Sequence, residues 1–145
     1  MRDGGNQYVG IRLRRINGDK WAERGSHQGL FIPQSGPEKQ ALITEGPTDT
    51  AAAISLGYFA IGRPNCCGGI EFIKSALRYL GIRRAVIVSD LDDPGLRGAT
   101  TLGLHLKIPW AILTVPSKDF RKAVMAWMTK QICDNSINQL LWQSP

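Results

Sequence analysis

From residue 41 onward, short apolar runs alternate with longer amphipathic runs, and this alternation constrains the fold more than any other feature of the sequence. The clearest apolar run is Ala-Val-Ile-Val-Ser at residues 85–89, whose unbroken, β-branched character is typical of an interior strand of a parallel sheet. Residues 70–80 place their apolar positions at helical spacing and stop at Gly81, as an amphipathic helix does. Alternating strands and helices pack as a mostly parallel sheet with helices on its faces. We therefore predict an α/β fold with about four strands.

The same criteria place the other elements of this region. Pro47 lies in the first turn of a predicted helix, and Gly57 ends that helix. Strands are predicted over residues 41–44, 59–61, 85–89 and 110–115, and helices over residues 47–56, 70–80 and 96–106. A single C-terminal helix follows, because five positions fall at helical spacing and form one face: Phe120, Val124, Trp127, Met128 and Gln131.

The N-terminal part of the chain has a different pattern. Residues 8–14 alternate apolar and polar side chains, and Asn17-Gly18 is a strong signal for a tight turn, so we expect a β-hairpin. A further strand is predicted over residues 30–32, ended by Pro33, and residues 34–39 form a polar connector. The expected organisation is a β-rich segment and connector at 1–39, the main α/β domain at 40–132 and a C-terminal tail at 133–145.

Charge is unevenly distributed along the chain, which carries a net charge of +6. Residues 1–44 hold seven basic against four acidic residues, and residues 96–145 hold six against two. Residues 45–95 hold five basic against six acidic residues. A basic surface around an acidic centre suits a polyanion held near a metal site, although many basic domains bind no nucleic acid.

Several classes of protein are disfavoured by composition. No apolar run approaches the roughly 20 residues that span a bilayer, and the first residues do not resemble a signal peptide. The three cysteines include no CxxC spacing, so we expect reduced thiols and no zinc site. These features predict a cytoplasmic protein without a membrane partner.

Acidic residues follow two of the predicted strands. Glu45 comes directly after the strand at 41–44, and Asp90, Asp92 and Asp93 come after the strand at 85–89. If these strands are parallel neighbours, their carboxylates face one crevice and repel one another unless a cation or a proton intervenes. Such a site suits Mg²⁺, which takes one or two carboxylates and completes its shell with water and phosphate.

The residues around these acids fit the same interpretation. Gly46 and Gly95 occupy strand-to-helix turns, where glycine permits close approach of a ligand. Asp49 falls in the first turn of the next helix, where it supports the site or simply stabilises the helix dipole. Residues 90–95 resemble the start of a calcium loop, but Pro94 and Thr101 occupy positions that need ligands. Each acid taken alone also fits an ordinary surface loop, and only their joint placement favours a metal site.

Two of these runs resemble the signatures of the Toprim family. The run Glu-Gly-Pro-Thr-Asp at residues 45–49 resembles the first signature, and Asp-Leu-Asp at residues 90–92 with Gly95 resembles the second. Lys118-Asp119 is similar to a looser late element of primase-type members. Residues 10–14 and 25–33 resemble the segment that precedes the domain in phage and plasmid primases, so the resemblance covers roughly residues 9–128.

The resemblance implies a Rossmann-like Toprim sheet and a role for each matching residue. Glu45 would act as general acid or base, Asp90 and Asp92 would bind Mg²⁺, and Mn²⁺ could substitute. Asp119 would ligate a second metal ion, and Asp49 would support the site. Three basic residues are candidate phosphate contacts: Arg63, Lys118 and Arg121.

By this resemblance, the implied function is synthesis of RNA primers on single-stranded DNA from nucleoside triphosphates during DNA replication, alongside a helicase or other replication protein. A Toprim nuclease and a non-catalytic nucleic-acid-binding module are the alternatives. The sequence departs from primases of this type in lacking the Cys/His spacing of an upstream zinc module, and only some 40 residues precede the first signature.

Overall fold

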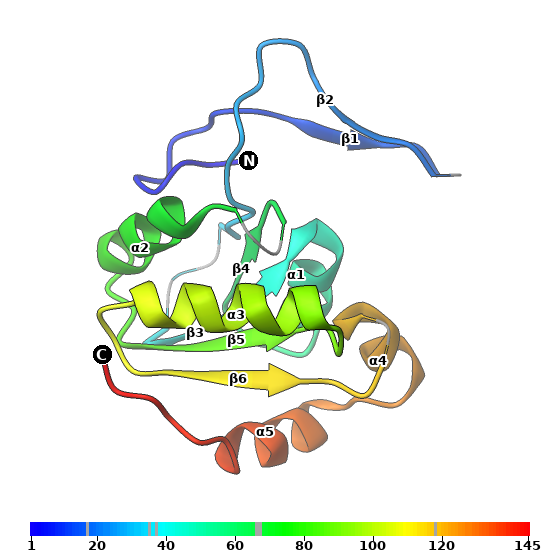
Figure 1. The fold of residues 1–145 in the computed structure, drawn as a ribbon. Helices are drawn as coiled ribbons and strands as arrows, with labels where there is room; N and C mark the ends of the chain where they lie inside the picture. The colour runs from blue at the N-terminus through cyan, green and yellow to red at the C-terminus, as the bar shows by residue number, and fades with distance from the viewer. Residues whose placement is uncertain (17, 35, 37, 66–67, 118) are drawn as a thin grey trace.

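A four-stranded parallel sheet forms the centre of the protein in a computed structural model, which describes residues 1–145 except 17, 35, 37, 66–67 and 118 (Figure 1). Its strands are β3 (Gln40–Glu45), β4 (Ala60–Arg63), β5 (Arg84–Ser89) and β6 (Trp110–Thr114), in the order β4-β3-β5-β6. All three neighbouring pairs are parallel. The predicted α/β class and parallel sheet are therefore confirmed.

Within the described part of the chain, five helices cover the two faces of this sheet. On one face, α2 (Ile70–Tyr79) and α3 (Asp93–His105) pack on Ile43 and Ile87. On the other face, α1 (Gly46–Ser55), α4 (Phe120–Ala126) and α5 (Lys130–Asn138) pack on Leu42 and Val86. Since successive residues of a strand point to opposite faces, burial on both faces explains why β3 and β5 are continuously apolar.

The N-terminal segment forms a small antiparallel hairpin of β1 (Arg12–Arg14) and β2 (Lys20–Ala22), in which Arg12 is opposite Ala22. Asn17, half of the predicted turn, lies outside the described residues. The strand predicted over residues 30–32 is reduced to single bridges, one of them between Phe31 and Gly62 of β4. The two backbone hydrogen bonds of this bridge, 2.9 and 2.8 Å long, attach the N-terminal segment to the sheet.

Two helix predictions differ from the structure. The single C-terminal helix is wrong: α4 ends at Ala126, and α5 starts anew where the Thr129 hydroxyl accepts a hydrogen bond from the Ile132 amide. α3 begins at Asp93, earlier than predicted, because the Asp92 side chain caps it. The boundary expected after residue 132 falls within α5, whose Cys133 and Ile137 are buried against the sheet.

No helix within the described part of the chain is long and apolar enough to cross a membrane.

Candidate active site

A pocket of about 300 Å³ opens at the edge where β3 and β5 end. Glu45 is the last residue of β3, and Asp90 directly follows β5 on the neighbouring strand. Asp49 from α1 and Asp119 from the residue before α4 line the same pocket. The parallel pairing of β3 with β5 therefore brings together acids that are far apart in the sequence, as the sequence predicted.

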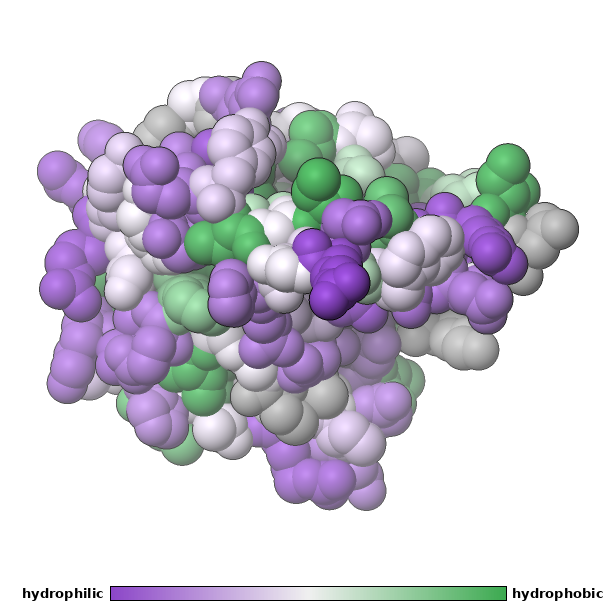
Figure 2. Space-filling model, turned by 90° about the horizontal axis from the view of Figure 1, so that it is seen from above, coloured by the Kyte–Doolittle hydropathy of each residue, from purple (hydrophilic) through white to green (hydrophobic). Residues whose placement is uncertain are grey.

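The β1–β2 hairpin supplies the opposite wall of this pocket with basic side chains. Arg12, Arg14 and Lys20 line it together with Arg121 from α4. Arg12 and Arg14 are two residues apart on one strand and so share a face, and Lys20 is the cross-strand partner of Arg14. None of these three cations was predicted as a site residue; the spacing of two between Arg12 and Arg14 within the predicted strand at 8–14 is a signal that could have found two of them. Figure 2 views the molecule from the side of this segment, where much of the surface is hydrophilic and the hairpin extends to one side.

Glu45 is paired with a buried arginine on the adjacent strand. Glu45 and Arg63 are register partners in β3 and β4, and Arg63 Nη2 donates to Glu45 Oε1 at 3.3 Å. Arg63 is 0% exposed and also donates to the Gly98 carbonyl. Burial raises the pKa of Glu45, Arg63 counteracts this, and Asp90, Asp49 and Asp92 raise it further. The net effect is a carboxylate that accepts a proton more readily than an ordinary glutamate.

The burial of Arg63 contradicts the prediction, made from the sequence, that Arg63 contacts phosphate. A guanidinium with no exposed surface cannot meet a phosphate from solvent, and Arg63 instead forms an ion pair with Glu45. Arg63 therefore positions the Glu45 carboxylate and favours its ionised form. Arg121 does line the pocket, as expected, and Lys118 lies outside the described residues.

Asp49 connects α1 to α4. Its Oδ1 accepts a hydrogen bond of 2.9 Å from the Arg121 amide, and the residue is 7% exposed. Burial raises the pKa of Asp49 to about 6, with the Arg121 hydrogen bond opposing the rise and Asp119 adding to it. Asp49 thus both holds α4 in place and adds negative charge to the pocket.

Three further acids differ in what they contact. Burial and the charges of Asp92 and Asp119 raise the pKa of Asp90. Asp92 caps α3 by accepting from the Gly95 amide at 2.7 Å, and it is not among the residues that line the pocket. Asp119 caps α4 through the Lys122 amide and lies 4.0 Å from Arg121. Asp92 and Asp119 therefore each cap a helix, in addition to any role as metal ligands.

The two glycines expected at the strand-to-helix turns are both required by geometry. Gly46 has a φ of +69°, a left-handed conformation that other residues adopt at a cost. A Cβ on Gly95 would lie 2.9 Å from Asp92 Oδ1 and 3.0 Å from the Asp90 carbonyl oxygen. Glycine at position 95 therefore allows α3 to start close against the acidic loop.

The donor set of the pocket fits Mg²⁺ bound in part by a substrate. No three His, Cys, Asp or Glu side chains within the described residues form a ready-made metal cage. Mg²⁺ commonly takes only one or two carboxylates and fills its shell with water and phosphate oxygens. The acids raise one another's pKa, which is the electrostatic condition that a divalent cation relieves.

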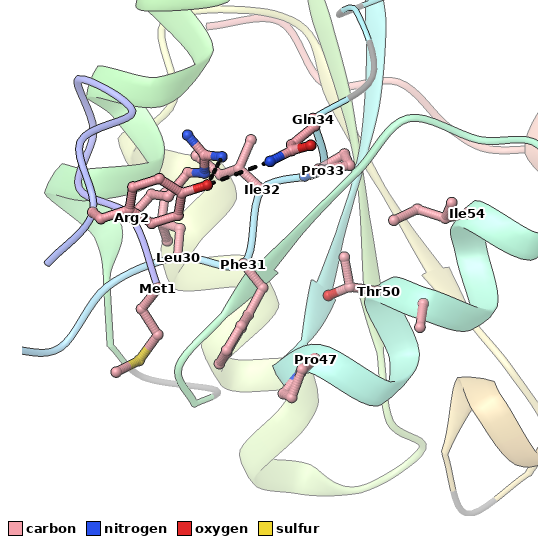
Figure 3. A pocket seen from close by; sticks show the side chains of 12 residues that line it. Met1, Arg2, Leu30, Phe31, Ile32, Pro33, Gln34, Pro47, Thr50 and Ile54 are labelled. Carbon is pink, nitrogen blue, oxygen red and sulfur yellow. Dashed lines mark hydrogen bonds between the residues drawn. The ribbon is translucent and has the colours of Figure 1, made fainter. Parts of the chain in front are cut away.

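A second hollow, of about 390 Å³, adjoins the acidic pocket and shares Phe31 and Pro47 with it (Figure 3). It lies between the N-terminal segment and α1. Along one side, Tyr8 accepts a hydrogen bond of 2.7 Å from Arg2, whose guanidinium lies 4.1 Å from the centre of the tyrosine ring. Tyr8 is 71% exposed, so an aromatic ring is available at the surface along this second hollow.

No family model and no curated protein matches the chain, but solved structures do. The Escherichia coli primase catalytic core is 15% identical, with a TM-score of 0.74, over 98% of this chain and 51% of that chain. The Aquifex aeolicus primase (zinc-binding and RNA polymerase domains) is 17% identical, with a TM-score of 0.77, over 99% of this chain and 40% of that chain. The primase fragment of the bacteriophage T7 primase-helicase is 18% identical, with a TM-score of 0.73, over 95% of this chain and 58% of that chain.

The chain has the Toprim fold of primase catalytic cores. It spans about half the length of these solved primases. In this Toprim fold, the acidic pocket lies at the carboxyl edge of the parallel sheet, where open α/β sheets generally bind ligands.

Proposed function

We propose that this chain is a primase-like Toprim domain that catalyses Mg²⁺-dependent nucleotidyl transfer and makes RNA primers on single-stranded DNA. One observation carries the proposal: Glu45, Asp49, Asp90 and Asp119 share a pocket with the cations of the β1–β2 hairpin. Carboxylates that hold a metal ion, facing cations that hold phosphates, are the two requirements of phosphoryl transfer.

The basic wall binds the triphosphate. Arg12, Arg14 and Lys20 contact phosphate oxygens from the hairpin side, and Arg121 contacts them from α4. These contacts neutralise charge that grows on the leaving pyrophosphate and hold the α-phosphorus in line with the attacking oxygen.

Glu45 handles the proton. The terminal 3′-hydroxyl oxygen forms a bond to the α-phosphorus, the bond from this phosphorus to the bridging oxygen breaks, and pyrophosphate leaves. The hydroxyl proton moves to the Glu45 carboxylate, whose pKa is raised by burial, so it is a stronger base than an ordinary glutamate. Arg63 keeps that carboxylate ionised before the step.

Asp90 and Asp92 would hold Mg²⁺, and Asp119 would contribute to a second metal position. When bound, the metal neutralises phosphate charge and lowers the pKa of the attacking hydroxyl. Asp49 adds negative charge that favours cation binding and fixes α4, which carries Arg121.

The hollow beside the pocket would carry the template. Tyr8 and Phe31 offer aromatic surface to unpaired bases, and Arg2 offers a cation to the backbone. One protein with the same fold, a DnaG primase catalytic domain at 16% identity, has been solved bound to single-stranded DNA. A helicase or other replication protein is the expected larger context.

The test combines the protein with Mg²⁺ or Mn²⁺, end-labelled single-stranded DNA and four ribonucleotides carrying a different label. Ribonucleotide-labelled oligomers that disappear with Glu45→Gln support the proposal. Shortened template would instead make the domain a nuclease, in which water replaces the hydroxyl at the same site. Binding of DNA and metal without either product would make it a non-catalytic module and overturn the proposed catalysis.

A further inference from the structure

A separate cavity of about 460 Å³ lies where α2 and α3 end and the chain turns into β5 and β6. Its apolar lining consists of Leu77 and Ile82 on the α2 side, and Leu106 and Ile108 on the α3 side. In Figure 1 these helix ends lie on the left, away from the carboxyl ends of the strands. The six residues of β5 separate the two edges by about 20 Å, so this cavity is distinct from the acidic pocket.

The rim of this cavity is basic. Lys74 and Arg78 from α2 and Lys107 from the loop after α3 line it. Glu71 is the acid beside them: Lys74 Nζ donates to it at 2.7 Å, a hydrogen bond that lowers the pKa of Glu71, with Arg78 and His105 lowering it further. No acidic side chain is among the described residues that line the cavity, and Glu71 pairs with Lys74 from outside it, which leaves Arg78 and Lys107 as charge in excess.

An apolar floor beneath a cationic rim selects ligands that combine a bulky apolar group with negative charge. Apolar walls favour a side chain such as Leu or Phe because the apolar surface of that side chain is removed from water when it is buried in the cavity. Among the described residues that line the cavity there is no aromatic ring, so a nucleobase would find no stacking partner. The rim cations match carboxylates on either side of the anchoring residue.

We propose that this cavity docks an acidic peptide segment of a partner protein, with one bulky apolar side chain inserted between α2 and the loop after α3. Charge complementarity commits the occupant to a peptide of this kind: the anchor fills the apolar floor, and flanking Asp or Glu residues meet Arg78 and Lys107. The inference does not depend on the proposed catalytic function, since it uses the opposite edge of the sheet.

The experiment titrates the full chain with the acetylated peptide Asp-Asp-Gly-Phe-Asp-Asp and follows the backbone amide NMR spectrum of the protein. Two control peptides replace the anchor (Asp-Asp-Gly-Gly-Asp-Asp) or reverse the charge (Lys-Lys-Gly-Phe-Lys-Lys). The double variant Arg78→Glu, Lys107→Glu reverses the excess charge, and Lys122→Glu on α4 is a single charge reversal at a residue that does not line the cavity. Glu71→Gln frees Lys74 from its pair.

The acidic anchored peptide is expected to shift amides at residues 74–82 and 106–108, while both control peptides bind more weakly. The double variant should weaken the peptide by about tenfold, Lys122→Glu should leave it unchanged, and Glu71→Gln should tighten it by about twofold. Equal binding of the three peptides, or an unchanged affinity in the double variant, would overturn the proposal. So would a single-stranded oligonucleotide that shifts these same amides when the peptide does not.

Discussion

Arg63 is a fully buried cation whose Nη2 lies 3.3 Å from Glu45 Oε1. Replacing it by methionine keeps most of the volume but leaves Glu45 without its opposite charge. We expect Arg63→Met to lower the free energy of unfolding by about 3 kcal/mol and to raise the pKa of Glu45 further. Urea denaturation measures the first effect, and an NMR titration of the Glu45 carboxyl measures the second.

Arg97 provides the matched control. Its contact with Asp93, at 3.9 Å on the exposed side of α3, is weak. Arg97→Met should therefore change the free energy of unfolding by no more than about 0.5 kcal/mol. Equal losses in the two variants would mean that the pair of Arg63 and Glu45 is no more important than a surface contact.

Asp49 makes the stability of the fold depend on pH. Its pKa rises from 3.8 to about 6 in the folded protein, so between these values the folded state binds more protons than the unfolded state. The contribution of Asp49 to stability is therefore fully present below about pH 4 and is lost as pH rises toward about 6.

Asp49→Asn should remove this loss, because an amide oxygen still accepts from the Arg121 amide but carries no charge. We expect the variant to be more stable than the parent at pH of about 7, on the order of 2 kcal/mol, and similar to it at pH of about 3.5. Thermal denaturation across this range provides the comparison. A stability gain of Asp49→Asn that instead grows toward low pH would contradict the raised pKa of Asp49.

At the scale of single elements, the start of α3 depends on Asp92, which accepts from the Gly95 amide at 2.7 Å. Asp92→Ala should destabilise the protein by about 1 kcal/mol, while Asp92→Asn should stay within a few tenths because Asn also caps helices. If Asp92 also binds metal, both variants will weaken Mg²⁺ binding. Calorimetry of Mg²⁺ binding beside denaturation curves separates the two roles, and unchanged metal affinity in both would leave Asp92 as a cap alone.

The β1–β2 hairpin is the element that supplies phosphate contacts from outside the sheet. Replacing Arg12, Arg14 and Lys20 by glutamine should weaken the binding of a fluorescently labelled nucleoside triphosphate and make that binding less dependent on salt concentration. A variant of equal charge loss, Arg15, Arg24 and Lys39 to glutamine, uses cations that do not line the pocket. Fluorescence anisotropy at several salt concentrations measures the salt dependence of binding for both variants. Equal salt dependence in the two variants would show that the hairpin cations do not bind phosphate at this site.

At the scale of the whole molecule, the sequence predicts best those strands and helices in which burial recurs at a regular spacing. The strand at residues 85–89 was visible because burial on both faces makes every position apolar. The break between α4 and α5 was missed because apolar spacing continues across it, whereas the cap at Thr129 depends on one local hydrogen bond. Periodicity therefore predicts elements better than it predicts their ends.

The residues of the acidic pocket likewise divide into those that the sequence predicts and those that it does not. Glu45 and Asp90 were predictable because parallel strands end at a common edge. The burial of Arg63 depends on its register opposite Glu45, and the basic wall depends on how a distant hairpin lies over that edge. Local sequence gives neither relation: the alternation of Arg12 and Arg14 predicts that they share a face, but not that this face lies over the acids.

The most direct test of the central claim, that these acids form one divalent-metal site, is paramagnetic broadening of the amide NMR spectrum by substoichiometric Mn²⁺. We predict selective loss of signals at residues 45–49 and 90–92 and around Asp119, reversed by excess Mg²⁺ and absent in Asp90→Asn. Broadening spread over other acidic surface residues, or unchanged in Asp90→Asn, would contradict a common metal site at the ends of β3 and β5.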